Sequence, residues 1–218
     1  MSQASAEGET PLSPAAALAV LNNQQRIVSG RLGSNVWIIT GTWGVAWLLG
    51  FLVIWAMDSH FSGFALQTWL GWTIFAALFA AAIVVSAVLG IRSGRGIRSN
   101  SANSFTGTVY GVTWAVAMLS ISVFGAGLLS HGMTAGLADL FYPSAYTLLV
   151  GILYLAAAAI WRIVQMIVAG AFLVLLAVVA PFLGHPTNYL VFGIAGGAMF
   201  LTLAIVGAVR LRSAVARG

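Results

Sequence analysis

The sequence predicts an all-α membrane protein with six transmembrane helices. Hydrophobic residues make up 61% of the 218 residues and charged residues only 6%, whereas a soluble domain carries about 25% charged residues. Six separate apolar stretches reach the roughly 20 residues that a helix needs to cross a hydrocarbon core. All nine basic residues are arginines that lie between or beyond these stretches. Together these observations favour a multi-pass bundle whose solvent is a lipid bilayer.

The chain opens with a segment that we expect to lie outside the membrane. Residues 1–12 are polar and carry two glutamates, which predicts a disordered tail. Residues 13–35 predict a cytoplasmic amphipathic helix and linker, with Ser13 as N-cap, Pro14 at the first helical position and Gly30 as the stop. Such a helix either docks a partner or the membrane surface, or merely covers the cytoplasmic end of the bundle. The second interpretation is the simpler one.

The predicted spans form one domain over residues 36–210, followed by a basic cytoplasmic tail at 211–218. No Gly or Pro separates the fourth span from the fifth, but one helix from Tyr142 to Leu183 would be about 60 Å long, twice the core thickness. We therefore expect a turn near Arg162. In chain order the spans are Val36–Met57, Thr68–Ile91, Val109–Leu129, Tyr142–Ile160, Val164–Leu183 and Tyr189–Val209.

The arginines also orient the spans. They precede the first span and follow the second, fourth and sixth, and none lies in the loops after the first, third and fifth. Cytoplasmic loops carry an excess of Lys and Arg, so both termini and the even-numbered loops are expected in the cytoplasm. This distribution accounts for the net charge of +5. It argues against nucleic-acid binding, because the arginines form no dense patch beside an aromatic surface.

Two similar phrases open the first and third spans. Residues 40–47 read TGTWGVAW and residues 106–114 read TGTVYGVTW. Each odd-numbered span also leads to a histidine on the predicted outer side, at His60, His131 and His185. The pattern predicts three parallel two-helix hairpin repeats. Chance similarity is the alternative in a chain this rich in Gly, Ala, Val and Trp.

The predicted outer loops hold the residues that come nearest to a metal site. His60, His131 and His185, with Asp58 and Asp139, offer imidazole and carboxylate ligands of the kind that bind zinc or copper. No HxH or HxxxH spacing links any two of them. Ordinary water-facing loop residues are therefore the better interpretation, and no metal or other cofactor is predicted.

A second candidate site lies in the loop GIRSGRGIRSN, which carries Arg92, Arg95 and Arg98. The loop has no lysine and does not follow the GxxxxGK[ST] order of a P-loop. Its arginines could bind the phosphate headgroups of anionic lipids. The alternative is that they only mark the cytoplasmic side.

The predicted membrane interior contains no Asp, Glu, Lys or His. Proton relays, voltage sensors and carboxylate-coupled transporters place ionisable groups in the membrane. No Ser-His, paired-Asp or HExxH arrangement supports hydrolysis, so we predict no enzyme and no catalytic residue. The polar side chains of the interior are Thr40, Thr42, Thr73, Ser86, Thr113, Ser120, Ser122, Thr147, Gln165 and Thr202.

Small and aromatic residues within the spans predict helix contacts. Gly193 and Gly197 form a GxxxG in the sixth span, and Ala76 and Ala80 repeat the four-residue spacing in the second. Packing inside one bundle is favoured over dimerisation. The tryptophans at 43, 47, 72 and 114 lie deep in their spans. The pair at 43 and 47, one helical turn apart, could line a pocket or serve only in packing.

Three phrases carry a family resemblance: GTWGVAWLLGF, SAVLGIRSGRG, and TGTVYGVTW followed by YPSAYTLLVGILYLAAAAIW. On them the chain resembles a set of uncharacterised six-span membrane proteins of actinobacteria that are commonly labelled "transporter", over most of its length from about residue 14. The resemblance implies a bacterial plasma membrane. The three-hairpin plan also resembles acid-resistance membrane proteins, in architecture only.

The sequence leaves two functions open. The first is a transporter or partner-dependent permease-like subunit for a neutral or lipid-like substrate, with membrane lipids and a separate energising or regulatory subunit as partners. The second is a non-transporting membrane scaffold or stress-related accessory protein. If the hydroxyl groups of several spans face one seam, transport is favoured, whereas hydroxyls that scatter toward lipid favour the scaffold.

Overall fold

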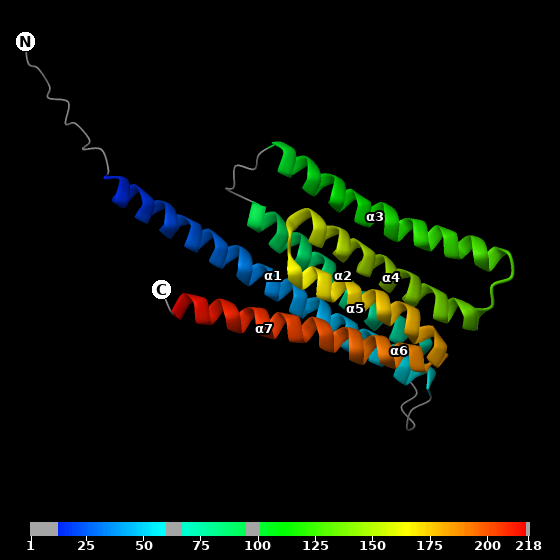
Figure 1. Ribbon diagram of the computed structural model, residues 1–218. Helices are drawn as coiled ribbons and strands as arrows, with labels where there is room; N and C mark the ends of the chain where they lie inside the picture. The colour runs from blue at the N-terminus through cyan, green and yellow to red at the C-terminus, as the bar shows by residue number, and fades with distance from the viewer. Residues whose placement is uncertain (1–12, 60–66, 95–100, 217–218) are drawn as a thin grey trace, which may run out of the picture.

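A computed structural model gives the backbone of residues 13–59, 67–94 and 101–216, and the side chains of residues 13, 35–59, 67–92 and 105–213. Over these ranges the chain is helical, with short turns (Figure 1). The long helices are α1 (Pro14–Asp58), α2 (Thr68–Gly94), α3 (Ser101–Ser130), α4 (Ala135–Trp161) and α5 (Val164–Val179). They are followed by η2 (Ala180–Leu183), α6 (Thr187–Val191), η3 (Phe192–Gly196) and α7 (Gly197–Ala216).

The structure confirms six apolar helices long enough to cross a membrane. They cover Asn35–Asp58, Thr68–Arg92, Phe105–Ser130, Ala135–Trp161, Val164–Leu183 and Thr187–Ser213. The turn predicted near Arg162 is confirmed, because this residue takes left-handed backbone angles (φ 56°, ψ 42°) between α4 and α5. The chain is therefore a polytopic membrane protein.

The predicted stop at Gly30 is wrong. Helix α1 begins at Pro14, as expected, and runs without a break to Asp58. A glycine inside a helix costs only about 1 kcal/mol relative to alanine, and no proline follows Gly30 to end the helix. Figure 1 shows the N-terminal half of α1 extending beyond the other helices, so it does not fold back over the end of the bundle.

Helix α4 begins well before the predicted Tyr142, and this moves Asp139 from a loop into a helix. Thr134 is the N-cap, and its side chain accepts a hydrogen bond from the backbone N–H of Leu137. Pro143 lies inside the helix and has no N–H to donate to the carbonyl four residues earlier, at Asp139. The side chain of Asn188 donates to that carbonyl instead, at 2.9 Å.

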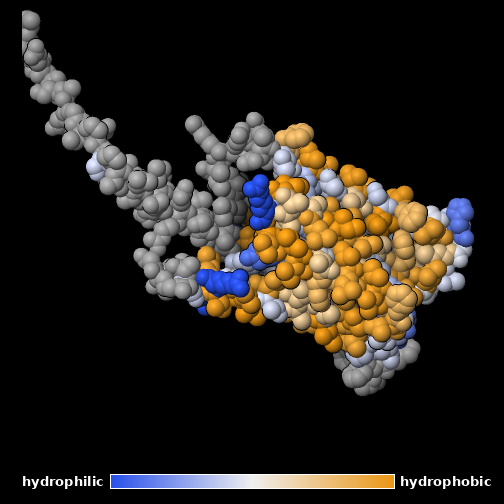
Figure 2. Space-filling model, in the orientation of Figure 1, coloured by the Kyte–Doolittle hydropathy of each residue, from blue (hydrophilic) through white to orange (hydrophobic). Residues whose placement is uncertain are grey.

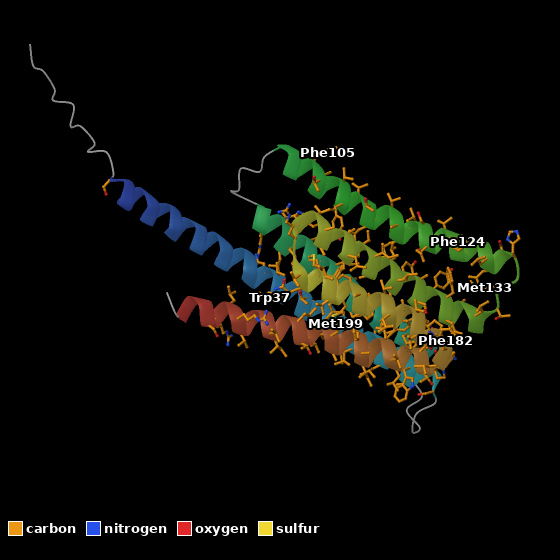
Figure 3. The ribbon with its side chains drawn as sticks, in the orientation of Figure 1. Trp37, Phe105, Phe124, Met133, Phe182 and Met199 are labelled. Atoms are coloured by element: carbon orange, nitrogen blue, oxygen red, sulfur yellow. The ribbon has the colours of Figure 1, made fainter. Side chains whose placement is uncertain are left out.

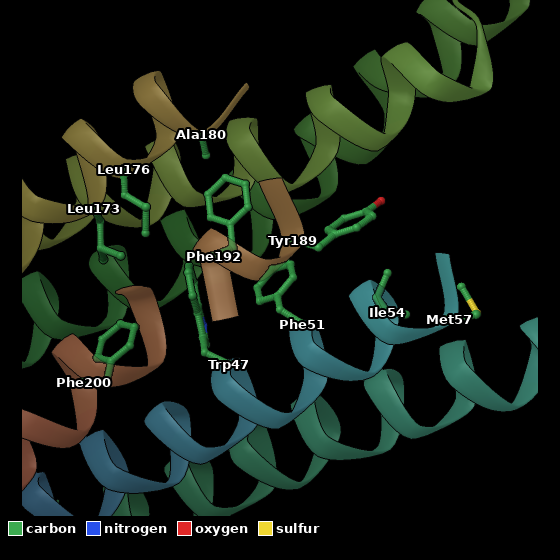
Figure 4. Packing of buried hydrophobic residues seen from close by; sticks show 10 residues of the cluster. All are labelled: Trp47, Phe51, Ile54, Met57, Leu173, Leu176, Ala180, Tyr189, Phe192 and Phe200. Atoms are coloured by element: carbon green, nitrogen blue, oxygen red, sulfur yellow. The ribbon is translucent and has the colours of Figure 1, made fainter. Parts of the chain in front are cut away.

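The core lies where α1, α5 and the α6–η3–α7 helix meet (Figure 4). Helix α1 supplies Trp47, Phe51, Ile54 and Met57, and these pack against Leu173, Leu176, Ala180, Tyr189, Phe192 and Phe200. The predicted GxxxG lies on this contact: a Cβ on Gly197 would come within 2.7 Å of Leu48 Cβ, and one on Gly193 within 3.2 Å of Phe51 Cβ. Both glycines therefore let α7 and η3 approach α1 closely.

Helices α2 and α3 are peripheral. Only 6% of the apolar window of each is buried, against 33% for the windows of α1, α5 and the last span. Figure 3 shows the outward side chains of α3, of which Phe105 and Phe124 are exposed. Ala76 and Ala80 are exposed on α2, so the predicted helix contact at this pair is wrong within one chain. The larger rings of Phe75 and Phe79 pack against Gly50 of α1 instead.

The described charges separate to the two ends of the bundle. Arg92 lies in the last turn of α2, Arg162 between α4 and α5, and Arg210 and Arg212 near the end of α7, at the end that Figure 1 shows on the left. Figure 2 shows hydrophobic residues across the middle of the visible face and hydrophilic ones toward its ends. This is the pattern of a protein with a lipid-facing belt.

The predicted hairpin repeat stays a prediction. Helix α4 packs chiefly against α5, and α7 chiefly against α1, so the main contacts also join different hairpins. The repeated phrases lie in different surroundings. Gly44 is in close contact with Leu201 of α7, whereas Gly111 of α3 has nothing within 4 Å of an added Cβ.

Candidate functional site

An aromatic cavity of about 640 Å³ lies between the α1–α2 pair and the α3–α4 pair, within the size range of small-molecule pockets. Twelve of the twenty described residues that line it are aromatic, so its walls suit an apolar or aromatic ligand. The first pair contributes Trp43, Trp47, Phe51, Ile54, Trp72, Phe75, Phe79 and Ile83. Opposite lie Trp114, Met118, Ala138, Asp139, Tyr142, Pro143, Tyr146, Thr147, Val150 and Tyr154, with Tyr189 and Phe200 from the last span.

Helical spacing brings these rings to one face of each helix. Trp43, Trp47 and Phe51 follow one another at intervals of four in α1, and Tyr142 and Tyr146 do so in α4. Residues four apart lie one above the other on a helix. Each helix therefore presents a continuous aromatic stripe to the cavity.

The rings brace one another. Phe75 and Phe79 stack with centroids 4.3 Å apart, and Phe51 meets Phe75 edge to face at 5.4 Å. On the opposite wall Trp114 and Tyr154 meet edge to face at 6.0 Å. Such pairs contribute about 0.5–1.5 kcal/mol beyond the burial of their area. The rings that line the cavity are therefore already packed against one another.

The cavity has one polar end. Asp139 is the one charged side chain among the described residues that line it. Its Oδ1 accepts a hydrogen bond of 3.2 Å from the hydroxyl of Tyr189. Tyr142 and Tyr146 follow Asp139 along α4 and stack on each other, and the hydroxyl of Tyr146 shares a hydrogen bond with Ser122 of α3. One carboxylate and several hydroxyl groups are therefore the polar groups of described walls that are otherwise apolar.

Three of the five residues predicted for the outer metal cluster come together at this end. His185 Nε2 lies 3.0 Å from Asp58 Oδ2 and 3.7 Å from Asp139 Oδ2. The contact ties the end of α1 to α4 and to the turn before α6. His131 lies elsewhere, with Nδ1 2.9 Å from the carbonyl of Gly127 in its own helix, and His60 lies outside the described residues.

The cluster does not have the form of a metal site. Over the residues that the structure describes, no group of three or more His, Cys, Asp or Glu side chains is placed to hold a metal ion. The 3.0 Å contact is an imidazole–carboxylate hydrogen bond, which joins helices without a ligand.

The hydroxyl groups of the interior do not form one polar seam. Seven of them donate to the carbonyl four residues earlier in their own helix: Thr40, Thr42, Thr73, Ser86, Thr113, Ser120 and Ser122. Thr202 is exposed. Ser86 accepts a 3.0 Å hydrogen bond from Trp43 Nε1, and Thr147 is buried in the cavity wall. By the criterion stated above, this scatter favours the scaffold over a hydrophilic transport path.

The predicted lipid-headgroup arginines are only partly described. Arg92 is exposed in the last turn of α2, and Arg95 and Arg98 lie outside the described residues. A smaller pocket of about 330 Å³ at the same end is lined by Arg210 and Gln165 together with Trp37 and apolar residues of α5 and α7.

The sequence pointed to only part of the cavity. The four deep tryptophans at 43, 47, 72 and 114 all line it. The tyrosines of α4 and the phenylalanines of α2 were missed. The signal that would have found them is the aromatic spacing of three or four within each span, as in Trp72–Phe75–Phe79 and Tyr142–Tyr146.

No protein-family model, curated protein or solved structure matches this chain.

Proposed function

We propose that this protein binds a hydrophobic, lipid-like small molecule in the aromatic cavity and handles it as a transporter or permease-like subunit of a bacterial plasma membrane. The observation that carries the proposal is the cavity itself. It measures about 640 Å³, it is lined mainly by aromatic rings, and it lies between the α1–α2 and α3–α4 pairs within the apolar part of the bundle. A molecule dissolved in the bilayer would need no hydrophilic path to reach it.

The nature of the walls supports a ligand with a large apolar body rather than a small hydrated ion. The hydroxyl groups that could line a hydrophilic path instead donate hydrogen bonds within their own helices. An aromatic ligand in the cavity would meet ring faces and edges already placed by neighbours, so little side-chain ordering would oppose binding.

The proposed orientation places both termini in the cytoplasm. It rests on the arginines at one end of the bundle and on Asp58, Asp139 and His185 at the other. Alkaline phosphatase, which is active only outside the cytoplasm, and a green fluorescent protein, which folds inside, would be fused in turn after Gly218. Fluorescence without phosphatase activity is expected, and the reverse result would refute the orientation.

Binding is tested with a neutral probe of three aromatic rings, triphenylphosphine oxide. Equilibrium dialysis would measure its uptake by the detergent-solubilised protein above that of empty micelles. Val150 lines the cavity, whereas Val116 is exposed on α3. Val150→Trp is expected to reduce uptake several-fold and Val116→Trp to leave it unchanged. Equal uptake by both variants would contradict binding in the cavity.

The scaffold is the second candidate, favoured by the scattered hydroxyls. Reconstituted vesicles separate it from transport. Probe that binds in the cavity but crosses protein-containing vesicles no faster than protein-free ones would favour a binding scaffold. Purification from native membranes in mild detergent would test the permease-subunit form, for which an ATPase in stoichiometric yield is expected.

A further inference from the structure

The charge at the outer end of the cavity is negative. Asp58 and Asp139 face a single imidazole, that of His185, at 3.0 and 3.7 Å. Two carboxylates and one imidazole carry a formal charge of −1 even when the imidazole is protonated. The described arginines lie at the opposite end of the bundle, so none of them neutralises this group.

Asp139 has capacity left for a ligand. Its Oδ1 accepts from Tyr189, but its Oδ2 lies 3.7 Å from His185 Nε2, beyond hydrogen-bond length. About a third of the side chain is exposed, at 34%, and the residue lines the cavity. Asp139 therefore lies in the cavity wall with a partly exposed side chain, one oxygen of which is beyond hydrogen-bond distance of the imidazole.

Aromatic residues share the cavity wall with this carboxylate. Tyr142 and Tyr146 follow Asp139 at i+3 and i+7, on the same face of α4. Tyr189 adds a third ring from the last span, and Figure 4 shows its hydroxyl directed away from the packed cluster beside Phe51. Ring faces attract cations through their quadrupole, and this attraction strengthens where water is excluded. Carboxylate and rings therefore select for the same charge.

The rest of the cavity suits the apolar part of such a cation. Beyond the polar end the described walls are mainly rings and apolar side chains, with Thr147 but without a second charge. A small hydrated metal ion or ammonium would make no apolar contact with these walls. An anion would be repelled by the carboxylate of Asp139. A cation whose charge is spread over a bulky apolar body matches both regions.

We infer that the ligand of this cavity is a lipophilic organic monocation, of the quaternary ammonium or phosphonium class, with its charged centre beside Asp139 and its apolar groups among the rings. The inference rests on the proposed function, because it names the ligand class of the same cavity. Asp139 acts as the residue that sets charge preference, and the aromatic walls supply affinity.

The test compares two probes that share three phenyl rings and differ in charge. Methyltriphenylphosphonium is the cation and triphenylphosphine oxide the neutral partner. The full chain would be placed in detergent-free nanodiscs of zwitterionic lipid. Equilibrium dialysis would then give the dissociation constant of each probe, with empty nanodiscs as the background. The cation is expected to bind about tenfold tighter or more, given the size of desolvated cation–π and charge interactions.

Three variants assign the preference to Asp139. Asp139→Asn keeps an oxygen that can accept the hydrogen bond from Tyr189. It is expected to equalise the affinities for the two probes, mainly by weakening binding of the cation. Asp139→Glu keeps the charge and is expected to retain most of the preference. Asp58→Asn removes the other carboxylate of this group, which meets the same imidazole but does not line the cavity, so it is expected to lower the cation preference less than Asp139→Asn does. Circular dichroism and gel filtration would show that each variant is folded.

Each outcome decides the matter. A cation preference that is lost in Asp139→Asn and only reduced in Asp58→Asn supports the inference. Equal binding of both probes by the native chain overturns it and leaves hydrophobic-ligand binding intact. Binding of neither probe overturns the proposed function as well. If Asp139→Asn does not fold, the preference of the native chain and the result for Asp139→Glu decide the inference. If Asp139→Glu folds but shows no preference for the cation, the role of Asp139 is overturned.

Discussion

The contact between α4 and α5 depends on two glycines that face each other. A Cβ on Gly151 would lie 2.9 Å from the carbonyl oxygen of Gly170 and 2.9 Å from the backbone nitrogen of Val174. A Cβ on Gly170 would lie 2.8 Å from the carbonyl oxygen of Gly151 and 3.0 Å from the backbone nitrogen of Leu155. Backbone atoms cannot rotate away as a side-chain end can. Alanine at either position must therefore push the two helices apart.

The expected cost follows from these distances. Ordinary Cβ contacts are several tenths of an ångström longer, so one methyl group strains the packing over more than one backbone atom. Overpacking of this kind costs about 1–3 kcal/mol, and the better helix propensity of alanine returns up to about 1 kcal/mol. We expect Gly151→Ala and Gly170→Ala each to lower the free energy of unfolding by about 1–2 kcal/mol.

Unfolding by sodium dodecyl sulfate in mixed micelles, followed by circular dichroism, would measure the effect. Gly111→Ala is the matched control, because nothing lies within 4 Å of its added Cβ. It is expected to be neutral or to stabilise by up to about 1 kcal/mol. The double variant Gly151→Ala/Gly170→Ala should cost less than the sum of the singles, because one separation of the helices relieves both. Variants at 151 and 170 as stable as the control would refute the close-contact argument.

Two further predictions concern hydrogen bonds between helices. Asn188→Leu would leave the carbonyl of Asp139 without its donor, and we expect a loss of about 1–2 kcal/mol in the same unfolding assay. Pro143→Ala restores an N–H to that carbonyl, so adding it to Asn188→Leu should recover most of the loss; no recovery would count against the proposed pairing. Tyr110→Phe removes the 2.8 Å hydrogen bond to the carbonyl of Leu153 that joins α3 to α4. A loss of about 0.5–1.5 kcal/mol is expected, with cysteine cross-links between α3 and α4 forming less readily, and an unchanged cross-linking rate would contradict the anchoring role.

Much of the fold followed from the sequence because lipid imposes simple length and polarity limits. The six spans required only apolar runs of sufficient length, and the turn at Arg162 required only that one helix could not be twice the core thickness. The errors arose where local signals compete. Gly30 lacked a following proline and did not end α1, and Thr134 capped α4 far ahead of the apolar run that marked its expected start.

The packing face of α2 shows why helix contacts were harder to predict. Ala76 and Ala80 have the small-xxx-small spacing, yet they are exposed, while Phe75 and Phe79 meet Gly50 across the contact. Small residues permit close approach on either helix, and here α1 supplies them. Spacing alone does not state which face turns toward a neighbour.

The sequence by itself determined that this chain is a membrane protein and how many times it can cross the bilayer. It also determined that the arginines precede the first span and follow the second, fourth and sixth. These properties depend on local composition and on distance along the chain. The tertiary structure decided that the aromatic stripes of α1, α2 and α4 enclose one cavity, and that Asp58, Asp139 and His185 meet at its polar end. Those residues are separated by as many as 127 positions, and only the rotation and packing of the helices brings them together.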